Sequence, residues 1–188
     1  MACRYLHEAI DVIADHRPDL VETLHRLQEA SELFVCLDGP LVPAPCTPRR
    51  WIDLWYSGKH HRHGASIQVL TGHTGFPVRV SPAEPGSTHD ITAARAHVLP
   101  ALCKAARPAC RPWRTRAAQG LEPGSRRRSG AGTRWCSCLT TSLRAPAERV
   151  SALLKSCKAL GYVALSPTRI TATAQAALVL LELKHNHR

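Results

Sequence analysis

A short apolar run that ends in a carboxylate constrains this chain more than any other stretch. Residues 33–39 read Leu-Phe-Val-Cys-Leu-Asp-Gly, so both faces of an extended segment here would be apolar. Such a run predicts a buried strand that stops at the turn signal Asp38-Gly39. Asp38 would then stand at the exit of a rigid strand, where a carboxylate is a candidate ligand for Mg²⁺ or Mn²⁺. The alternative is a plain Asp-Gly turn, which is the commoner use of this dipeptide.

The length and the charge narrow the class of protein. A chain of 188 residues can form one domain with its own core. Its 25 Lys and Arg against 14 Asp and Glu give a net charge of +11, which suits a polyanionic partner such as DNA. A solvated basic surface without a partner is the alternative. Residues 1–16 lack a secretory pattern and no apolar run reaches membrane-spanning length, so we expect a cytoplasmic protein with reduced thiols.

Apolar spacing predicts the helices and strands. Residues 3–30 predict two helices divided at Pro18, and the first begins so near Met1 that we expect a larger helical unit before it. Two arms of a hairpin, 65–70 and 76–80, should pair beside the Asp38 strand around a turn at 72–75. A helix over 91–106 should follow, capped by Ser87, Thr88 or Asp90. Helices over 147–160 and 172–184, with Val150, Leu154, Val179, Leu180 and Leu183 on their apolar faces, complete an α/β domain with a mixed sheet.

Five motifs in a fixed order carry a family resemblance. They are Leu37-Asp38-Gly39, Tyr56-Ser57-Gly58-Lys59-His60, Arg62-His63-Gly64, Gln68-Val69 and Pro85-Gly86-Ser87-Thr88-His89-Asp90. Over most of residues 4–106 and 142–188 the chain resembles DDE-type transposases of bacterial insertion sequences, the branch related to Harbinger-like DDE endonucleases. The resemblance implies a ribonuclease-H-like fold, a mixed sheet flanked by helices, in an endonuclease domain over 31–188. It also implies that residues 1–30 are a helical remnant or connector of a DNA-binding region.

The resemblance also implies an activity and its residues. Family members cleave and join DNA with divalent metal ions, Mg²⁺ or Mn²⁺, and usually act as multimers, so DNA and a second copy of the chain are the expected partners. Asp38 and Glu148 match two catalytic carboxylates, and Asp90 matches a recurrent Asp, so all three are candidate metal ligands. From the residues alone, Glu148 could instead favour a helix dipole and Asp90 could cap a helix.

Basic residues in the second and third motifs suit a nucleic-acid contact. Lys59, His60, Arg62 and His63 are predicted to contact the DNA backbone. His60, His61 and His63 could instead bind zinc, although their spacing lacks a matching Cys or His pair. Cys136-Ser137-Cys138 does not form a zinc knuckle either.

The family pattern breaks where the second catalytic Asp should stand. Relatives place it after the 91–106 helix, on a strand that reads Leu-Ala-Asp-Lys-Gly-Tyr. Here no acidic residue lies between Asp90 and Glu122, and the segment from about 107 to 140, rich in Arg, Pro and Gly, is predicted to be poorly structured. If this segment is genuine, Asp90 and Glu122 are the first candidates for the third carboxylate.

A shifted reading frame would explain the break. Codons permitted for residues 110–117 can be written TGC CGA CCC TGG CGG ACA AGG GCT, and the frame one base earlier then reads Leu-Pro-Thr-Leu-Ala-Asp-Lys-Gly. Coincidence, helped by variable third bases, is the alternative. The sequence therefore predicts a DDE nuclease domain impaired in catalysis. Its rivals are a basic DNA-binding remnant without catalysis and a metal-binding scaffold built on the Cys and His residues.

Overall fold

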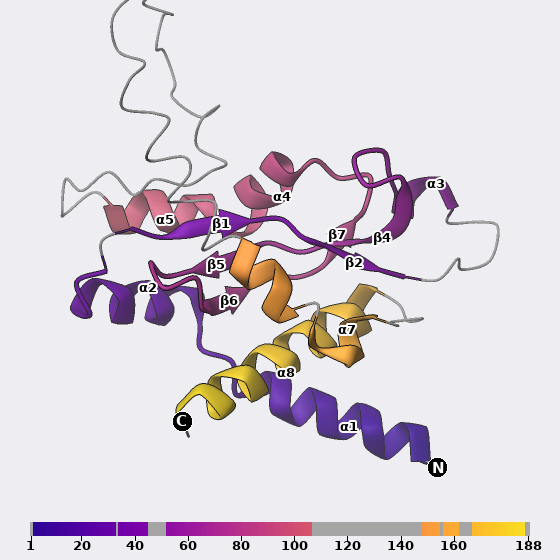
Figure 1. Ribbon diagram of the computed structural model, residues 1–188, viewed down its shortest axis with the longest axis horizontal. Coiled ribbons are helices and arrows are strands. Elements are labelled where there is room, and N and C mark those ends of the chain that lie inside the picture. Colours follow the sequence, from indigo (N-terminus) through magenta and orange to yellow (C-terminus); the bar gives the residue numbers. More distant parts are fainter. Residues whose placement is uncertain are drawn as a thin grey trace, which may run out of the picture.

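The computed structural model describes residues 2–32, 34–44, 52–106, 148–154, 156–161 and 167–186. Its described part is an α/β arrangement in which antiparallel sheets are flanked by helices (Figure 1). The predicted poorly structured segment at 107–140, with Glu122 and Cys136-Ser137-Cys138, lies outside the described residues. In that described part, no helix has both the length and the apolarity needed to cross a membrane.

The strand of Asp38 pairs with the predicted hairpin. Strand β1 (Cys36–Asp38) lies antiparallel to β5 (Val69–Thr71), with Asp38 opposite Val69, and β5 pairs in turn with β6 (Pro77–Val80). The order β1-β5-β6 confirms the hairpin and its place beside the Asp38 strand. The expectation of a mixed sheet is wrong for the described strands, since every pairing among them is antiparallel.

The predicted strand over 65–70 is divided in two. Strand β4 (Arg62–Ser66) pairs with β2 (Leu41–Pro43), β3 (Tyr56–Ser57) and β7 (Glu84–Pro85), whereas β5 belongs to the other sheet. Between them, the N–H of Ile67 donates to the carbonyl of Pro40 at 3.2 Å. Strands β2, β3 and β7 and the short helix α3 (Ile52–Trp55) are not predicted from the sequence, because elements of two to four residues are too short to show a periodicity.

The two N-terminal helices agree with the prediction. Helix α1 (Ala2–Asp15) ends before Pro18, and α2 (Leu20–Glu29) is capped by Asp19, whose carboxylate accepts a hydrogen bond from the N–H of Val21 at 3.1 Å. Leu6 of the first helix is 60% exposed. Helix α1 contacts α8, and its buried residue is Ala14.

The predicted helix over 91–106 is two helices. Helix α4 (Asp90–His97) and α5 (Leu99–Ala106) are separated at Val98. Pro100 explains the break, because proline cannot donate to the carbonyl of residue 96 and its ring would clash there. The predicted caps are wrong: His89 occupies the N-cap without a side-chain hydrogen bond, and Asp90 is the first helical residue.

The helices after residue 147 cover the face of the β1-β5-β6 sheet that lies opposite to α4 and α5. Residues 148–154 are helical, and α7 (Lys158–Gly161) and α8 (Pro167–Asn186) follow. Val150, Leu154 and Val179 are buried as predicted, but Leu180 and Leu183 are about half exposed. The reason is that α8 contacts β6 on one side and α1 on another, so its buried positions include Ile170, Ala174 and Leu178.

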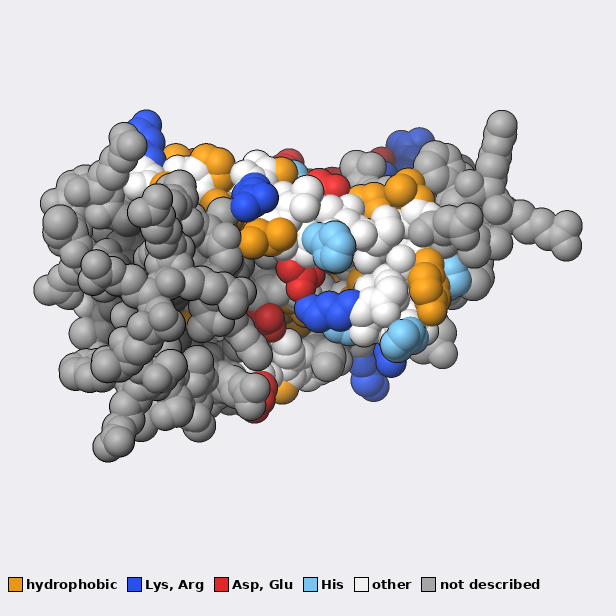
Figure 2. Space-filling view, turned by 90° about the horizontal axis from the view of Figure 1, so that it is seen from above, with side chains coloured by type: hydrophobic (Ala, Val, Ile, Leu, Met, Phe, Trp, Pro, Cys, Tyr) orange, Lys and Arg blue, Asp and Glu red, His pale blue; other side chains and the backbone are white. Residues whose placement is uncertain are grey.

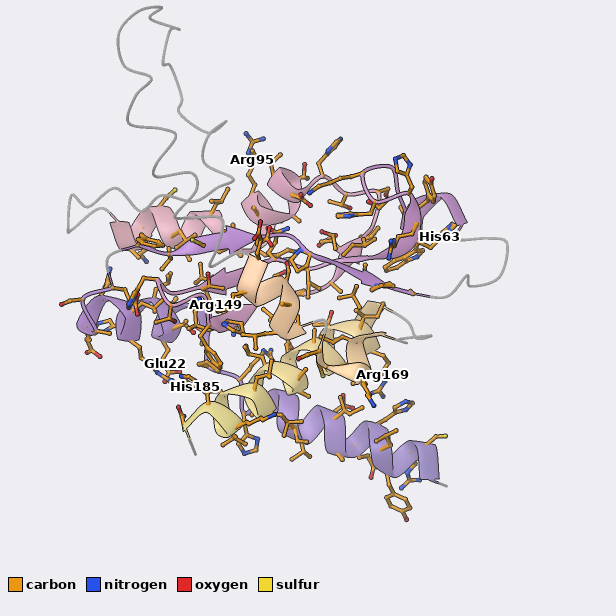
Figure 3. All side chains as sticks on the ribbon, in the orientation of Figure 1. Glu22, His63, Arg95, Arg149, Arg169 and His185 are labelled. Carbon is orange, nitrogen blue, oxygen red and sulfur yellow. The ribbon has the colours of Figure 1, made fainter. Side chains whose placement is uncertain are left out.

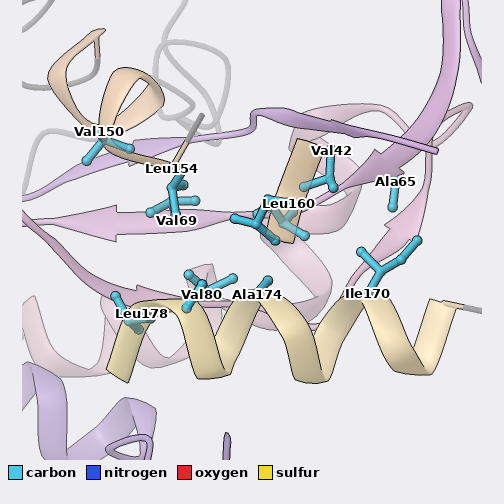
Figure 4. Packing of buried hydrophobic residues seen from close by; sticks show 12 residues of the cluster. Val42, Ala65, Val69, Val80, Val150, Leu154, Leu160, Ile170, Ala174 and Leu178 are labelled. Atoms are coloured by element: carbon cyan, nitrogen blue, oxygen red, sulfur yellow. The ribbon is translucent and has the colours of Figure 1, made fainter. Parts of the chain in front are cut away.

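Two cores lie on the two faces of the strands. One contains Leu37 and Leu70 with residues of α2, α4 and α5. The other contains Val69 and Val80 with residues of the 148–154 helix, α7 and α8 (Figure 4). Neighbours such as Val69 and Leu70 enter different cores because successive side chains of a strand point to opposite faces.

Candidate functional site

Three of the five motifs line one pocket. It has a volume of about 320 Å³ and lies among the end of β1, the β3–β4 turn and the loop before α4. These segments meet on the side of the molecule that carries α4, β7 and β4 in Figure 1. The lining residues are Gly39, Leu41, Tyr56, Ser57, Gly58, Lys59, His60, Ser66, Gly86, Ser87, Thr88, His89 and Asp90.

Two motif glycines are required by close packing. A Cβ added at Gly86 would lie 2.5 Å from the carbonyl oxygen of Gly64 and 2.6 Å from that of Trp55. One added at Gly39 would lie 2.9 Å from Oδ1 of Asp90 and 2.9 Å from Nε2 of Gln68. At Gly86 the close atoms belong to the backbone, so only glycine allows these segments to meet there, whereas at Gly39 two side-chain ends would have to shift.

A charged pair stands at the pocket. Nζ of Lys59 lies 2.5 Å from Oδ2 of Asp90, and the two side chains are 64% and 38% exposed. Asp90 opens α4, where a negative charge is favoured by the helix dipole. The pair joins the second motif to the fifth across 31 residues of sequence.

The side chain of Asp38 contacts the helix of residues 148–154. The half-buried Asp38 accepts a hydrogen bond at Oδ2 from Oγ of Ser151, at 3.2 Å. Glu148 is exposed and lies three residues before Ser151, so both project from the same side of their helix. Asp90, in contrast, contacts the position next to Asp38, Gly39.

The described residues do not assemble a metal site of three ligands. Among them, no group of three or more His, Cys, Asp or Glu side chains could hold a metal ion. This applies to Asp38, Asp90 and Glu148, and to His60, His61 and His63. The described carboxylates are therefore not gathered in the way that the resemblance implies for a pair of divalent ions.

The predicted DNA contacts lie on the β3–β4 hairpin. Lys59, His60 and Arg62 are exposed there. His63 is half-buried, and its ring packs edge-on against that of Tyr56 at a centroid distance of 5.2 Å. Figure 3 shows His63 near this hairpin, well away from Arg149 of the late helix. The hairpin thus presents two cations and an imidazole to solvent, which is the chemistry that phosphate contacts require.

The face of the molecule seen from above carries side chains of both positive and negative charge (Figure 2). Figure 2 shows acidic, basic and His side chains next to one another on the face seen from above. Much of the positive surplus comes from residues 107–147, which contain many Arg and, as their only acid, Glu122.

Comparison with known families assigns the segment that carries the motifs. Residues 37–115 match the family model of the DDE superfamily endonucleases. This match supports a DDE-type, transposase-like endonuclease domain in this part of the chain. The matched range of the DDE domain contains all five motifs and ends inside the stretch that lacks an acidic residue. No curated protein and no solved structure matches the chain.

Sequence reasoning missed three residues around the DDE motifs. Ser151 holds Asp38, and its spacing of three from Glu148 was the signal that could have identified it. Ser66 and Gln68 are buried beside the pocket, at 3% and 2% exposure. Gln68 lies in a quoted motif, but nothing in the sequence indicates that its amide lies beside Gly39, since the two residues are 29 positions apart and belong to different connecting segments.

Proposed function

We propose that this chain is a transposase-derived DDE endonuclease domain that binds DNA and is impaired in metal-dependent strand cleavage and transfer. The family match supports the nuclease origin. The observation that carries the impairment is the lack of any acidic residue between Asp90 and Glu122, where relatives place the second catalytic Asp. A ribonuclease-H-like fold belongs to this proposal, supported by the antiparallel order β1-β5-β6 and the late helix at the end of β1.

The remaining carboxylates have defined places in this proposal. Asp38 and Glu148 flank the contact between β1 and the 148–154 helix, where Ser151 orients the Asp38 carboxylate. Divalent ions, when bound by active relatives, supply the activation of the attacking oxygen and the stabilisation of the leaving oxygen. The loss of the third carboxylate removes both a negative charge and a group that positions the metal ions. Cleavage should therefore fall by orders of magnitude.

A shifted reading frame is our explanation for the missing Asp. In the shifted frame, the Asp codon combines bases of Arg114 and Thr115, and residue 115 is where the family match ends. The nucleotide sequence that encodes residues 103–142 tests this directly. A reading of Leu-Ala-Asp-Lys-Gly one base upstream would support the explanation, and a different reading would refute it.

A cleavage assay tests the function. Duplex DNA is incubated with Mg²⁺ or Mn²⁺ and either the natural chain or Asp38→Ala, and we expect equal, background cleavage from both. A gene corrected in frame should gain cleavage, and the same gene with Asp38→Ala should lose it again. Strong cleavage by the natural chain that Asp38→Ala abolishes would refute the impairment.

The second candidate function is a basic DNA-binding remnant without any metal site. The lack of a three-ligand group among the described residues favours it. Titration of Mn²⁺ followed by its electron paramagnetic resonance signal distinguishes the two. Loss of bound Mn²⁺ on Asp38→Ala would support a residual metal site, whereas identical weak binding by both chains would support the remnant.

A further inference from the structure

The pocket among the motifs has one polar group without a partner at its wall, and a second lies behind Gly39. Oγ of Ser66 and Nε2 of Gln68 are buried, and in the described structure neither has a hydrogen-bond partner. Ser66, which is 3% exposed, lines the pocket itself, and the Gln68 amide lies directly behind Gly39. Buried polar groups are nearly always paired in native proteins, so the Ser66 hydroxyl indicates a ligand that supplies the missing partner.

The charges at the pocket decide which ligand chemistry fits. A phosphate group offers only acceptors, and the Asp90 carboxylate at the pocket wall would repel it. The edge of a nucleobase offers both donors and acceptors. Asp90 can accept from such an edge, and the Ser66 hydroxyl can donate to it. The combined set therefore matches a base better than a phosphate.

We propose that this pocket binds one unpaired nucleotide of the bound DNA, an inference that rests on the proposed function. A volume of about 320 Å³ is at the small end of ligand pockets, enough for one nucleotide and too small for a base pair with its backbone. Tyr56, 40% exposed, offers a ring on which a base can stack. Lys59 and His60 are exposed on the same hairpin, where they can contact the phosphate of that nucleotide.

The position of the pocket explains why the nucleotide must be unpaired. Ser66 is only 3% exposed where it lines the pocket, so a base stacked in a duplex cannot reach its hydroxyl. A base that has left the stack can enter, as in enzymes that read extrahelical bases by their hydrogen-bonding edges. The Lys59–Asp90 pair would open on entry, because Lys59 gains a phosphate and Asp90 gains a base donor.

The test is calorimetric titration in EDTA with each of the four deoxynucleoside monophosphates and with inorganic phosphate at the same ionic strength. At least one nucleotide should bind, and inorganic phosphate should bind at least about tenfold more weakly. Ser66→Ala and Asp90→Asn should each weaken nucleotide binding by about fivefold or more. Lys59→Gln tests the proposed contact of Lys59 with the nucleotide phosphate. Its matched control is Lys104→Gln, on the exposed surface of α5 outside the pocket, which should leave binding unchanged.

Folding is checked on the same samples. Because Ser66→Ala removes a buried hydroxyl that lacks a partner, its Tm should be equal to or above that of the natural chain. Equal affinity for phosphate and nucleotide would overturn the proposal, as would unchanged nucleotide binding by folded Ser66→Ala and Asp90→Asn, or no binding at about 10 mM nucleotide. Duplex DNA binding at low salt is measured in parallel. If it persists while nucleotide binding is absent, this inference fails alone; if it too is absent, the proposed function fails.

Discussion

At the residue scale, Gly39 couples the strand of Asp38 to Asp90. We predict that Gly39→Ala lowers the free energy of unfolding by about 1–3 kcal/mol, because its Cβ would overlap Asp90 Oδ1 and Gln68 Nε2. Gly58→Ala is the matched control, since a Cβ there meets nothing within 4 Å. Urea denaturation of both variants provides the measurement. Equal stability of the two variants would show that the Asp90 side chain does not lie against Gly39.

Asp19 is a second residue whose environment has a measurable consequence. The N–H groups of Val21 and then Leu20 hold the pKa of the Asp19 carboxyl below its usual value of 3.8. A carboxyl with a lowered pKa in the folded state stabilises the protein above its unfolded pKa, and this contribution is lost as the pH falls through the folded value. Asp19→Ala should therefore lower the Tm at pH 6, and the difference from the natural chain should shrink below pH 3.8. A difference that is constant with pH would contradict this cap.

At the element scale, one ion pair joins the first helix to the last. Nη1 of Arg169 donates to both carboxylate oxygens of Asp11, at 2.9 and 2.7 Å. We predict a coupling energy of about 1 kcal/mol in a double-mutant cycle of Arg169→Ala and Asp11→Ala, since both side chains are partly exposed. Amide hydrogen exchange in α1 should become faster in each single variant.

The control for this pair is the exposed contact of Arg4 with Glu8 within α1. Those side chains are 79% and 54% exposed, so the same cycle should give at most about 0.5 kcal/mol. A coupling at Arg169–Asp11 no larger than this would mean that packing against α8 alone holds α1 in place.

At the scale of the whole molecule, the charge should govern DNA binding. We predict that duplex affinity falls steeply with salt, because bound cations release counterions from DNA. Lys59→Gln and Arg62→Gln should each reduce the slope of log K against log salt by about 1, whereas Lys104→Gln should not. Fluorescence anisotropy over a salt series measures these slopes. A flat response would argue that the net charge of +11 has no DNA partner.

The sequence by itself determined the local structure and the order of the motifs. Pro18 predicts the break between α1 and α2, and the turn at 72–75 predicts the β5–β6 hairpin, because these signals act over a few residues. The missing acid after Asp90 is likewise a property of sequence alone.

Only the tertiary structure decided which side chains meet. Packing between elements places Asp38 with Ser151 from the 148–154 helix, and it places the Asp90 carboxylate beside Gly39 and Lys59. The pocket likewise joins a strand end, a hairpin turn and a helix start, and its unpaired Ser66 hydroxyl is buried by segments distant in sequence. Periodicity reports which face of an element is apolar, but it does not report which other element covers that face. The partners of Asp38 and Asp90 therefore depended on packing between elements that lie far apart in the chain.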